Sequence, residues 1–183
     1  MAAAERIADQ ILVLRAQMGE KAALLQLFER YDSRLRYLMR RLLPVIHVAD
    51  DAVQDVWLTV LRRIRTLRDP GAFRAWIYRI ARNRAYRELR GAQKPGPFLE
   101  DPLEPGPAPQ EEALAAEDAA RVHAALSKLH PEHTEVLTLR YIEDMPYAEI
   151  AVVVGVPLGT VRSRIHQAKR ALRRAMEGLT DGE

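Results

Sequence analysis

Apolar residues recur at helical spacing in three separate runs before residue 91. The runs are Leu24, Leu27, Phe28, Tyr31 and Leu35; then Val53, Val56, Trp57, Val60 and Ile64; then Phe73, Trp76, Ile77 and Ile80. An interval of three to four residues places these side chains on one face of an α-helix. Asp69-Pro70-Gly71 is a turn signal between the second run and the third. The pattern predicts that this part of the chain is an all-helical bundle.

Helical patterns continue after the middle of the chain, over residues 112–129, 132–142, 146–153 and 158–176, and no segment has the alternation of a strand. The N-terminal stretch MAAAERIADQILVLRAQ mixes charged residues into its apolar positions. It therefore lacks the apolar core of a signal peptide and reads as the start of a helix. The expected fold class is all-α.

A segment rich in proline separates the two sets of helices. Six of the eleven prolines lie between Pro95 and Pro109, a density that excludes both helix and ladder pairing. We therefore predict a helical domain over residues 1–91, a flexible acidic linker over 92–112 and a second helical domain over 113–183. Extended at ~3.1 Å per residue, the linker spans about 65 Å, or roughly two turns of duplex DNA, a length that allows the two domains to reach separate DNA segments.

Charge is segregated along the chain although the net charge is only +3. Residues 73–90 carry six arginines against one acid, residues 160–174 carry six cations and no acid, and residues 98–118 carry seven acids and no base. Two basic segments suggest two contacts with a polyanion, whereas a single basic helix face is more often plain solvated surface. The absence of cysteine excludes disulfides and thiolate sites, and no stretch approaches the ~20 apolar residues of a membrane span. We expect a cytoplasmic protein.

Residues 147–172, YAEIAVVVGVPLGTVRSRIHQAKRAL, have helix-turn-helix spacing. A short helix with Ile150 and Ala151 inward stops at Gly155, and a longer helix begins after Pro157. A helical wheel places Val161, Ile165, Ala168, Leu172 and Met176 on its inward face. The outward residues, which are the candidates for contacts with DNA bases and phosphates, are Thr160, Arg162, Ser163, Gln167, Lys169, Arg170 and Arg174. The alternative, an amphipathic helix of an ordinary bundle, fits less well because an incidental surface normally mixes both signs of charge.

Two further helices carry candidate contacts in the first domain. The helix beginning near Asp50 has two aspartates, Asp50 and Asp51, that could simply cap it, but Gln54 and Asp55 face away from its apolar stripe. The next helix, FRAWIYRIARNRAYRELR, is expected to bury its apolar positions. Its outward set is Arg79, Arg82, Asn83, Tyr86 and Arg90. An aromatic ring within a cationic face suits unstacked bases, although a solvated helix with a snorkelling tyrosine explains this helix equally well when it is taken alone.

Taken in order, the strings DDAVQDVWLTVL, FRAWIYRIARNRAYRELR and YAEIAVVVGVPLGTVRSRIHQAKRAL resemble the extracytoplasmic-function sigma factors of bacterial RNA polymerase. The resemblance extends from about Leu24 to Met176. It implies that the first domain is like sigma region 2 and the second like region 4. Two positions depart from the pattern: Gln167 stands where many relatives have a cation, so the upstream sequence it reads is open, and the run around Pro44 is less regular than usual.

The resemblance also implies partners and roles. Asp51, Gln54, Asp55 and Leu58 would bind the clamp of the largest subunit of core RNA polymerase. The loop 67–72 and the helix with Asn83 would take up a flipped base of the downstream, minus-10 promoter element. The helix from Leu158 would enter the major groove of the upstream, minus-35 element, and its domain would dock on the flap of the second polymerase subunit. Because no residues beyond Met176 could form a sensor, we expect control by an anti-sigma factor that covers both domains.

Other classes of function have weaker support in the sequence. His130-Pro131-Glu132-His133 brings two imidazoles close together, but they straddle a helix start without a third ligand, so capping is the better interpretation. There is no phosphate-binding loop and no nucleophile elbow. We therefore expect neither enzymatic activity nor a cofactor. A helix-turn-helix activator that never delivers polymerase is the main alternative, and an adaptor that only sequesters anti-sigma factors is the third.

Overall fold

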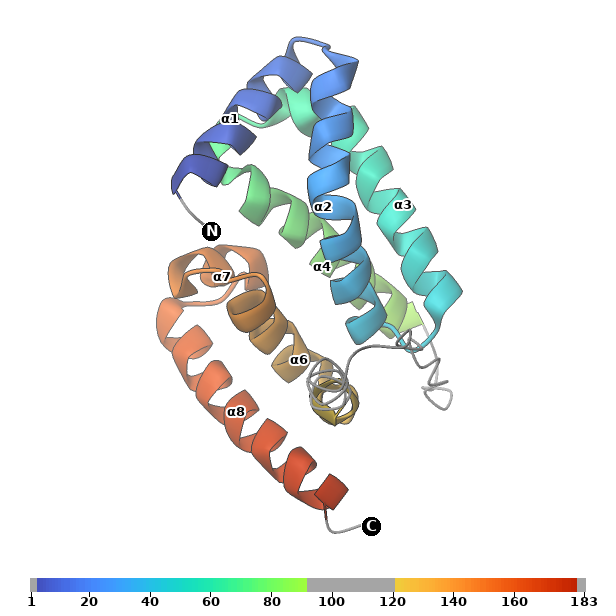
Figure 1. Ribbon diagram of the computed structural model, residues 1–183, viewed down its shortest axis with the longest axis vertical. Helices are drawn as coiled ribbons and strands as arrows, with labels where there is room; N and C mark the ends of the chain where they lie inside the picture. Colours follow the sequence, from blue (N-terminus) through green and yellow to red (C-terminus); the bar gives the residue numbers. More distant parts are fainter. Residues whose placement is uncertain (1–2, 92–120, 181–183) are drawn as a thin grey trace, which may run out of the picture.

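The computed structural model describes residues 3–91 and 121–180, and in these two ranges every regular element is helical, as the apolar spacing predicts (Figure 1). The predicted linker over 92–112 lies outside the described residues. The first range contains α1 (Ala3–Gln17), α2 (Lys21–Leu42), α3 (Ile46–Arg63) and α4 (Phe73–Gly91). Two short 3₁₀ turns, η1 (Ile64–Thr66) and η2 (Pro70–Ala72), connect α3 to α4, and Asp69 caps η2 by accepting a hydrogen bond from the Gly71 amide at 2.9 Å.

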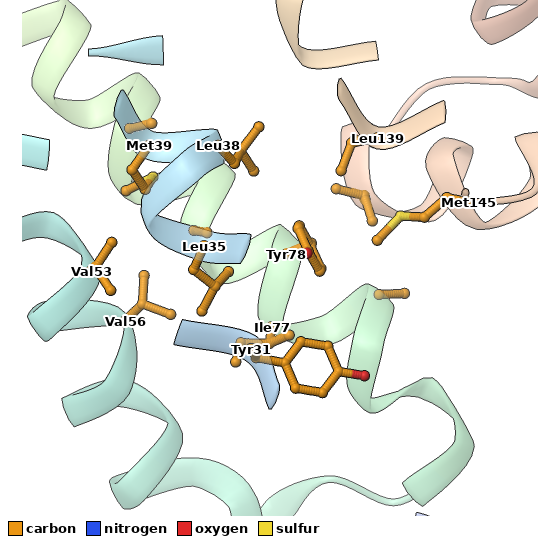
Figure 2. Packing of buried hydrophobic residues seen from close by; sticks show 14 of the residues in the cluster. Tyr31, Leu35, Leu38, Met39, Val53, Val56, Ile77, Tyr78, Leu139 and Met145 are labelled. Atoms are coloured by element: carbon orange, nitrogen blue, oxygen red, sulfur yellow. The ribbon is translucent and has the colours of Figure 1, made fainter. Parts of the chain in front are cut away.

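The four helices of the first range bury their apolar faces against one another around α2. Figure 2 shows its core residues meeting those of α3 and α4. The labelled side chains from these helices are Tyr31, Leu35, Leu38, Met39, Val53, Val56, Ile77 and Tyr78. Full burial stabilises the fold by about 1.5–3 kcal/mol for each large apolar side chain. Phe28 departs from the predicted apolar face: it is 40% exposed and rests its ring 5.0 Å from that of Trp57.

Helix α3 begins earlier than the sequence pattern predicts, so the interpretation of Asp50 and Asp51 as its caps is wrong. The helix starts at Ile46, four residues after α2 ends at Leu42, with Val45 at its N-cap. Asp50 lies in the second turn, where its carboxylate accepts hydrogen bonds from Arg40 and Arg36 of α2, each at 3.1 Å. These two guanidiniums, Arg40 first, hold the pKa of Asp50 below its usual value. Asp50 therefore ties α3 to α2.

The second range forms a smaller helical unit. Residues 121–127 are helical, and α6 (Pro131–Leu137) continues into a π-helical turn over Thr138–Ile142 (η3), followed by α7 (Tyr147–Val154) and α8 (Leu158–Thr180). His130 caps α6, because its Nδ1 accepts a hydrogen bond from the Glu132 amide at 3.4 Å. No helix in the described ranges is long and apolar enough to cross a membrane.

The two halves pack against each other. Helix α7 contacts α4, α6 contacts α2, and α8 lies outermost, with α6 between it and the first four helices (Figure 1). Figure 2 shows Leu139 and Met145 of the second half facing Leu38 and Tyr78 of the first, and all four belong to one continuous apolar cluster. The sequence predicts two domains that reach separate DNA segments. In this arrangement the two halves share an apolar cluster, and one side of α4 is covered.

Candidate nucleic-acid interface

The outward face of α8 is built as the helical wheel predicts. All seven candidate side chains are exposed, namely Thr160, Arg162, Ser163, Gln167, Lys169, Arg170 and Arg174. On the opposite face Val161, Ile165 and Ala168 are buried and Leu172 is half-buried, whereas Met176 is 38% exposed. The exposed cations therefore lie on a helix whose other side is anchored in the core.

Local contacts divide the cations of this helix into two kinds. Arg164 turns inward and forms an ion pair with Glu132 of α6 at 3.1 Å. The Lys169 ammonium lies 5.2 Å from the centre of the Tyr141 ring, and the Tyr141 hydroxyl raises the pKa of Lys169. Arg162, Arg170 and Arg174 are exposed. Most cations of the basic segment 160–174 therefore lie on an exposed surface, whereas Arg164 helps to hold α8 against α6.

The turn before α8 sets the angle between the two helices of the motif. Gly155 ends α7 with φ +74° and ψ 34°, a left-handed conformation that residues with a side chain adopt only at a cost. Its amide donates to the Ala151 carbonyl at 2.9 Å. A Cβ at this position would meet open space, so the requirement for glycine comes from the backbone conformation alone. The helix-turn-helix geometry predicted from the sequence is present.

Helix α3 presents a second surface. Asp51, Gln54, Asp55 and Leu58 are all exposed on it, as predicted. Leu61, one turn beyond Leu58, is 53% exposed and enlarges the apolar part of this surface, which sequence reasoning missed although its i+3 spacing from Leu58 was readable. Asp55 also accepts from the Arg84 guanidinium of α4 at 2.8 Å. One of the outward carboxylates is therefore shared with a neighbouring helix.

The predicted outward set on α4 is only partly outward. Arg79, Asn83 and Arg90 are exposed, but Arg82 and Tyr86 are half-buried because α6 of the second half packs beside them. The helical wheel of a single helix cannot indicate a covering element that comes from more than forty residues away. This face is a solvated surface in one part and an interface in the other.

Glu135 of α6 is the residue that occupies Arg82 and Tyr86. Its Oε1 lies 2.9 Å from Arg82 Nε in an ion pair, and its Oε2 accepts from the Tyr86 hydroxyl at 3.0 Å. The Arg82 guanidinium also stacks 4.5 Å from the centre of the Tyr86 ring. Glu135 is fully buried, and this burial raises the pKa of its carboxyl to about 7 against the opposing effect of Arg82. Sequence reasoning missed Glu135, although an acid four residues before the buried Leu139, on the same helix face, is a readable signal of a buried partner.

A second group of contacts lies closer to the start of α4. Arg74 is only 6% exposed, donates a hydrogen bond to the Glu143 carbonyl and lies 3.9 Å from the Glu149 carboxylate of α7. Arg34 of α2 reaches the buried Glu143 carboxylate at 3.7 Å. Acids of the second half thus meet cations of the first at several points along α2 and α4.

A cavity of about 230 Å³ lies at the loop between α3 and α4, where the family resemblance places the capture of a flipped base. Its lining includes Pro70, Gly71 and Phe73 from the loop and α4, Arg6 and Asp9 from α1, and Glu149 from α7 of the second half. Asn83 lies about two turns further along α4 than the last residue of this lining, Ala75. The structure therefore does not bring Asn83 and the loop into one pocket.

Two family models match the chain in the order of its halves: Sigma-70 region 2 over residues 27–94 and Sigma-70, region 4 over residues 119–172. The RNA polymerase sigma-H factor of Pseudomonas aeruginosa is 34% identical, over 93% of this chain and 95% of its own length. The ECF RNA polymerase sigma-E factor of Escherichia coli K12 is 32% identical, over 96% of this chain and 97% of its own length.

Solved structures resemble the chain as well. CnrH in complex with the cytosolic domain of CnrY matches with a TM-score of 0.70 and 28% identity, over 93% of this chain and 98% of that one. The sigma factor RpoE in complex with the anti-sigma factor NepR from Bartonella quintana matches with a TM-score of 0.66 over 83% of this chain and 95% of that one; at 20% identity this likeness concerns the fold.

Proposed function

The chain belongs to the extracytoplasmic-function (ECF) RNA polymerase sigma factors, and from this premise we infer that it binds core RNA polymerase, directs it to specific promoters and helps to open their DNA. The single observation that carries the inference is the presence of both family regions, in order, on one chain with two exposed candidate binding faces, on α3 and on α8. In this proposal the chain performs no catalytic step of its own, because RNA synthesis belongs to the polymerase.

We assign the contact with polymerase to the exposed face of α3. Asp51, Gln54 and Asp55 supply carboxylates and an amide, and Leu58 with Leu61 supplies exposed apolar surface beside them. An apolar centre rimmed by charged groups is the usual composition of a specific protein interface. The expected partner is the clamp of the largest subunit, and the second half is expected to dock on the flap of the second subunit.

We assign promoter recognition to two helices. The outward face of α8 would read the upstream element, with Arg162, Ser163 and Gln167 nearest to the bases and Arg170 and Arg174 on phosphates. Along α4, the set Arg79, Arg82, Asn83, Tyr86 and Arg90 would bind the downstream element as a single strand, through cations and one aromatic ring. The cavity at the Pro70–Phe73 loop is of the size and position to accept an unstacked base.

We further propose that the chain acts in the cytoplasm, where its polymerase and DNA are, and that an anti-sigma protein controls it. The likeness to CnrH, whose structure was solved with the cytosolic domain of CnrY, supports a partner of this type. A helix-turn-helix activator that never delivers polymerase would not need a polymerase-binding surface on α3. The match of residues 27–94 to Sigma-70 region 2 therefore favours a sigma factor over this alternative.

Competition for core polymerase tests the proposal. Purified core is mixed with a labelled primary sigma factor, and the unlabelled chain is titrated in. A sigma factor displaces the primary factor in a saturable way, because both use the clamp. An activator leaves the primary factor bound at every concentration, and this result would contradict the proposal.

A further inference from the structure

Helix α1 lies against the loop between α3 and α4, which comprises residues 64–72 and contains the turns η1 and η2 (Figure 1). Two residues of α1, Arg6 and Asp9, also line the cavity at this loop. The helix ends ten residues before residue 27, where the match to Sigma-70 region 2 begins. Its role therefore does not follow from the matched region and has to be derived from its contacts.

Gln17, the last residue of α1, binds the beginning of the loop. Its Nε2 donates to the Ile64 carbonyl at 2.9 Å and to the Leu67 carbonyl at 2.7 Å. Because both partners can only accept, the side-chain amide must present its NH₂ group to them. The Leu67 amide donates to the same Ile64 carbonyl at 3.1 Å and closes the turn η1. One glutamine side chain thus joins both ends of this turn to α1.

Gln10 lies two helical turns earlier on α1 and touches the loop near its other end. A Cβ atom on Gly71 would lie only 2.6 Å from Gln10 Nε2, so the glycine lets this side chain approach the loop backbone closely. Asp69 closes the same turn by accepting from the Gly71 amide at 2.9 Å. Side chains of α1 therefore contact the loop at both ends, beside the cavity that it forms.

We propose that α1 holds this loop in the shape that accepts an unstacked base of the downstream promoter element, and that Gln17 is the positioning residue. The inference rests on the role proposed above for the cavity. Unstacking a base costs free energy, and a cavity that must first be ordered would add to that cost. Gln17 is not among the residues that line the cavity, so it acts through the Ile64 and Leu67 backbone.

Three variants separate positioning from stability. Gln17→Met keeps a side chain of similar length but removes the donor to both carbonyls. Gln17→Lys is the rescue variant, because an ammonium group on a long side chain can donate to both. Val13→Ala is the matched control: Val13 is fully buried on α1, and its truncation loosens the packing of the helix while Gln17 keeps its hydrogen bonds.

The variants are tested as full chains bound to core RNA polymerase. The wild-type holoenzyme first selects promoter duplexes from a library of randomised sequence, and permanganate reactivity then follows the opening of a selected duplex. Gln17→Met should slow opening by about tenfold, the effect of leaving hydrogen-bonding groups of an ordered loop without a partner. It should also flatten the base preference at one downstream position. Affinity for core polymerase should stay at the wild-type level, and Gln17→Lys should restore the base preference.

Val13→Ala should lower the thermal unfolding midpoint and keep the base preference. A Gln17→Met chain with the wild-type opening rate and base preference would overturn the inference. The same loss of preference in Val13→Ala would overturn it too, because α1 would then act only through the stability of the fold. Selection of no sequence by the wild-type holoenzyme would overturn the proposed function, and the inference with it.

Discussion

Charged residues in the first half differ in what they contact, and this decides which of them are available to a partner. Asp32 accepts from Arg36 at 2.6 Å and from the Trp57 indole at 3.0 Å, and Asp50 accepts from Arg36 and Arg40. These carboxylates join α2 to α3. Asp51, the next residue, is exposed on the proposed polymerase surface, so neighbours in sequence serve the fold and the interface separately.

Reversing the charge of Asp51 tests that surface. We expect Asp51→Lys to weaken binding to core polymerase by about tenfold, because losing one exposed pair is worth under ~1 kcal/mol while a misplaced like charge at a dense interface adds repulsion. Affinity is measured by titrating labelled chain with core. The helical circular dichroism signal should not change, and a native spectrum with unchanged affinity would refute the assignment of Asp51.

Asp55 needs a different design because it also pairs with Arg84. The double variant Asp55→Lys/Arg84→Glu keeps an ion pair between α3 and α4 but reverses the charge on the α3 surface. We expect it to lose core binding as Asp51→Lys does, while its thermal unfolding midpoint stays within a few degrees of the wild type. Core binding at the wild-type level would show that Asp55 serves only the contact between the two helices.

At the scale of elements, the two faces of α8 have separate roles. Its inward side is fixed by Val161, Ile165 and Ala168, and its outward side is free of the contacts between the two halves. Duplex binding through α8 therefore does not require the two halves to separate. Helix-turn-helix proteins place the beginning of this helix deepest in the major groove.

Two substitutions separate base reading from phosphate binding on α8. Gln167→Ala should relax preference at one or two upstream base pairs, since a bidentate glutamine contact discriminates by about 1–3 kcal/mol, with little change in salt dependence. Arg174→Ala should weaken binding to all sequences alike and lower the salt slope by about one. Both are measured with a panel of upstream duplexes at several salt concentrations. The reverse assignment of effects would show that the helix sits differently in the groove.

The elements that could be predicted are those whose apolar residues repeat with the helical period, and the errors arise where local signals mislead. The start of α3 was missed because Val45, Ile46 and Val48 are β-branched and Asp50-Asp51 resemble a cap. Gly155 was predictable because few other residues adopt its conformation. The covering of Arg82 and Tyr86 was not predictable, because it depends on Glu135. That residue is distant in sequence, and the apolar spacing of α4 carries no information about it.

At the scale of the whole molecule, closure, meaning the packing of the second half against the first, should respond to pH through two groups with opposite signs. Burial raises the pKa of Glu135 to about 7, so its ionisation opposes closure, and closure weakens as pH rises from about 4.5 to about 7. Burial and the nearby Arg41 lower the pKa of His123, which contacts Tyr37 across the interface, so its protonation opposes closure as pH falls below 6.5. The charged or titratable groups that face these two residues are Arg82, Tyr86, Arg164, Glu132, Arg41 and Tyr37.

Removing either titratable group, Glu135 or His123, should reveal the pH response of the other. A donor and an acceptor dye are attached to cysteines introduced at the exposed positions Gln26 on α2 and Val152 on α7. With Glu135→Gln, energy transfer between the two dyes should rise with pH as His123 loses its proton. With His123→Phe, which keeps a ring beside Tyr37, transfer should fall steadily between about pH 4.5 and pH 7. The wild-type chain should show a smaller change than either variant. The same slope in all three chains would mean that neither group is linked to closure.

Transcription with purified components tests most directly whether the chain is a promoter-specific initiation factor. Core RNA polymerase is combined with the chain, without any primary sigma factor, on fragmented genomic DNA of the source bacterium, and the 5′ ends of the transcripts are mapped. The account predicts a limited set of start sites that share one upstream and one downstream sequence element at constant spacing, and fewer transcripts from the same sites with Asp51→Lys. Start sites no different from those of core polymerase alone would contradict it.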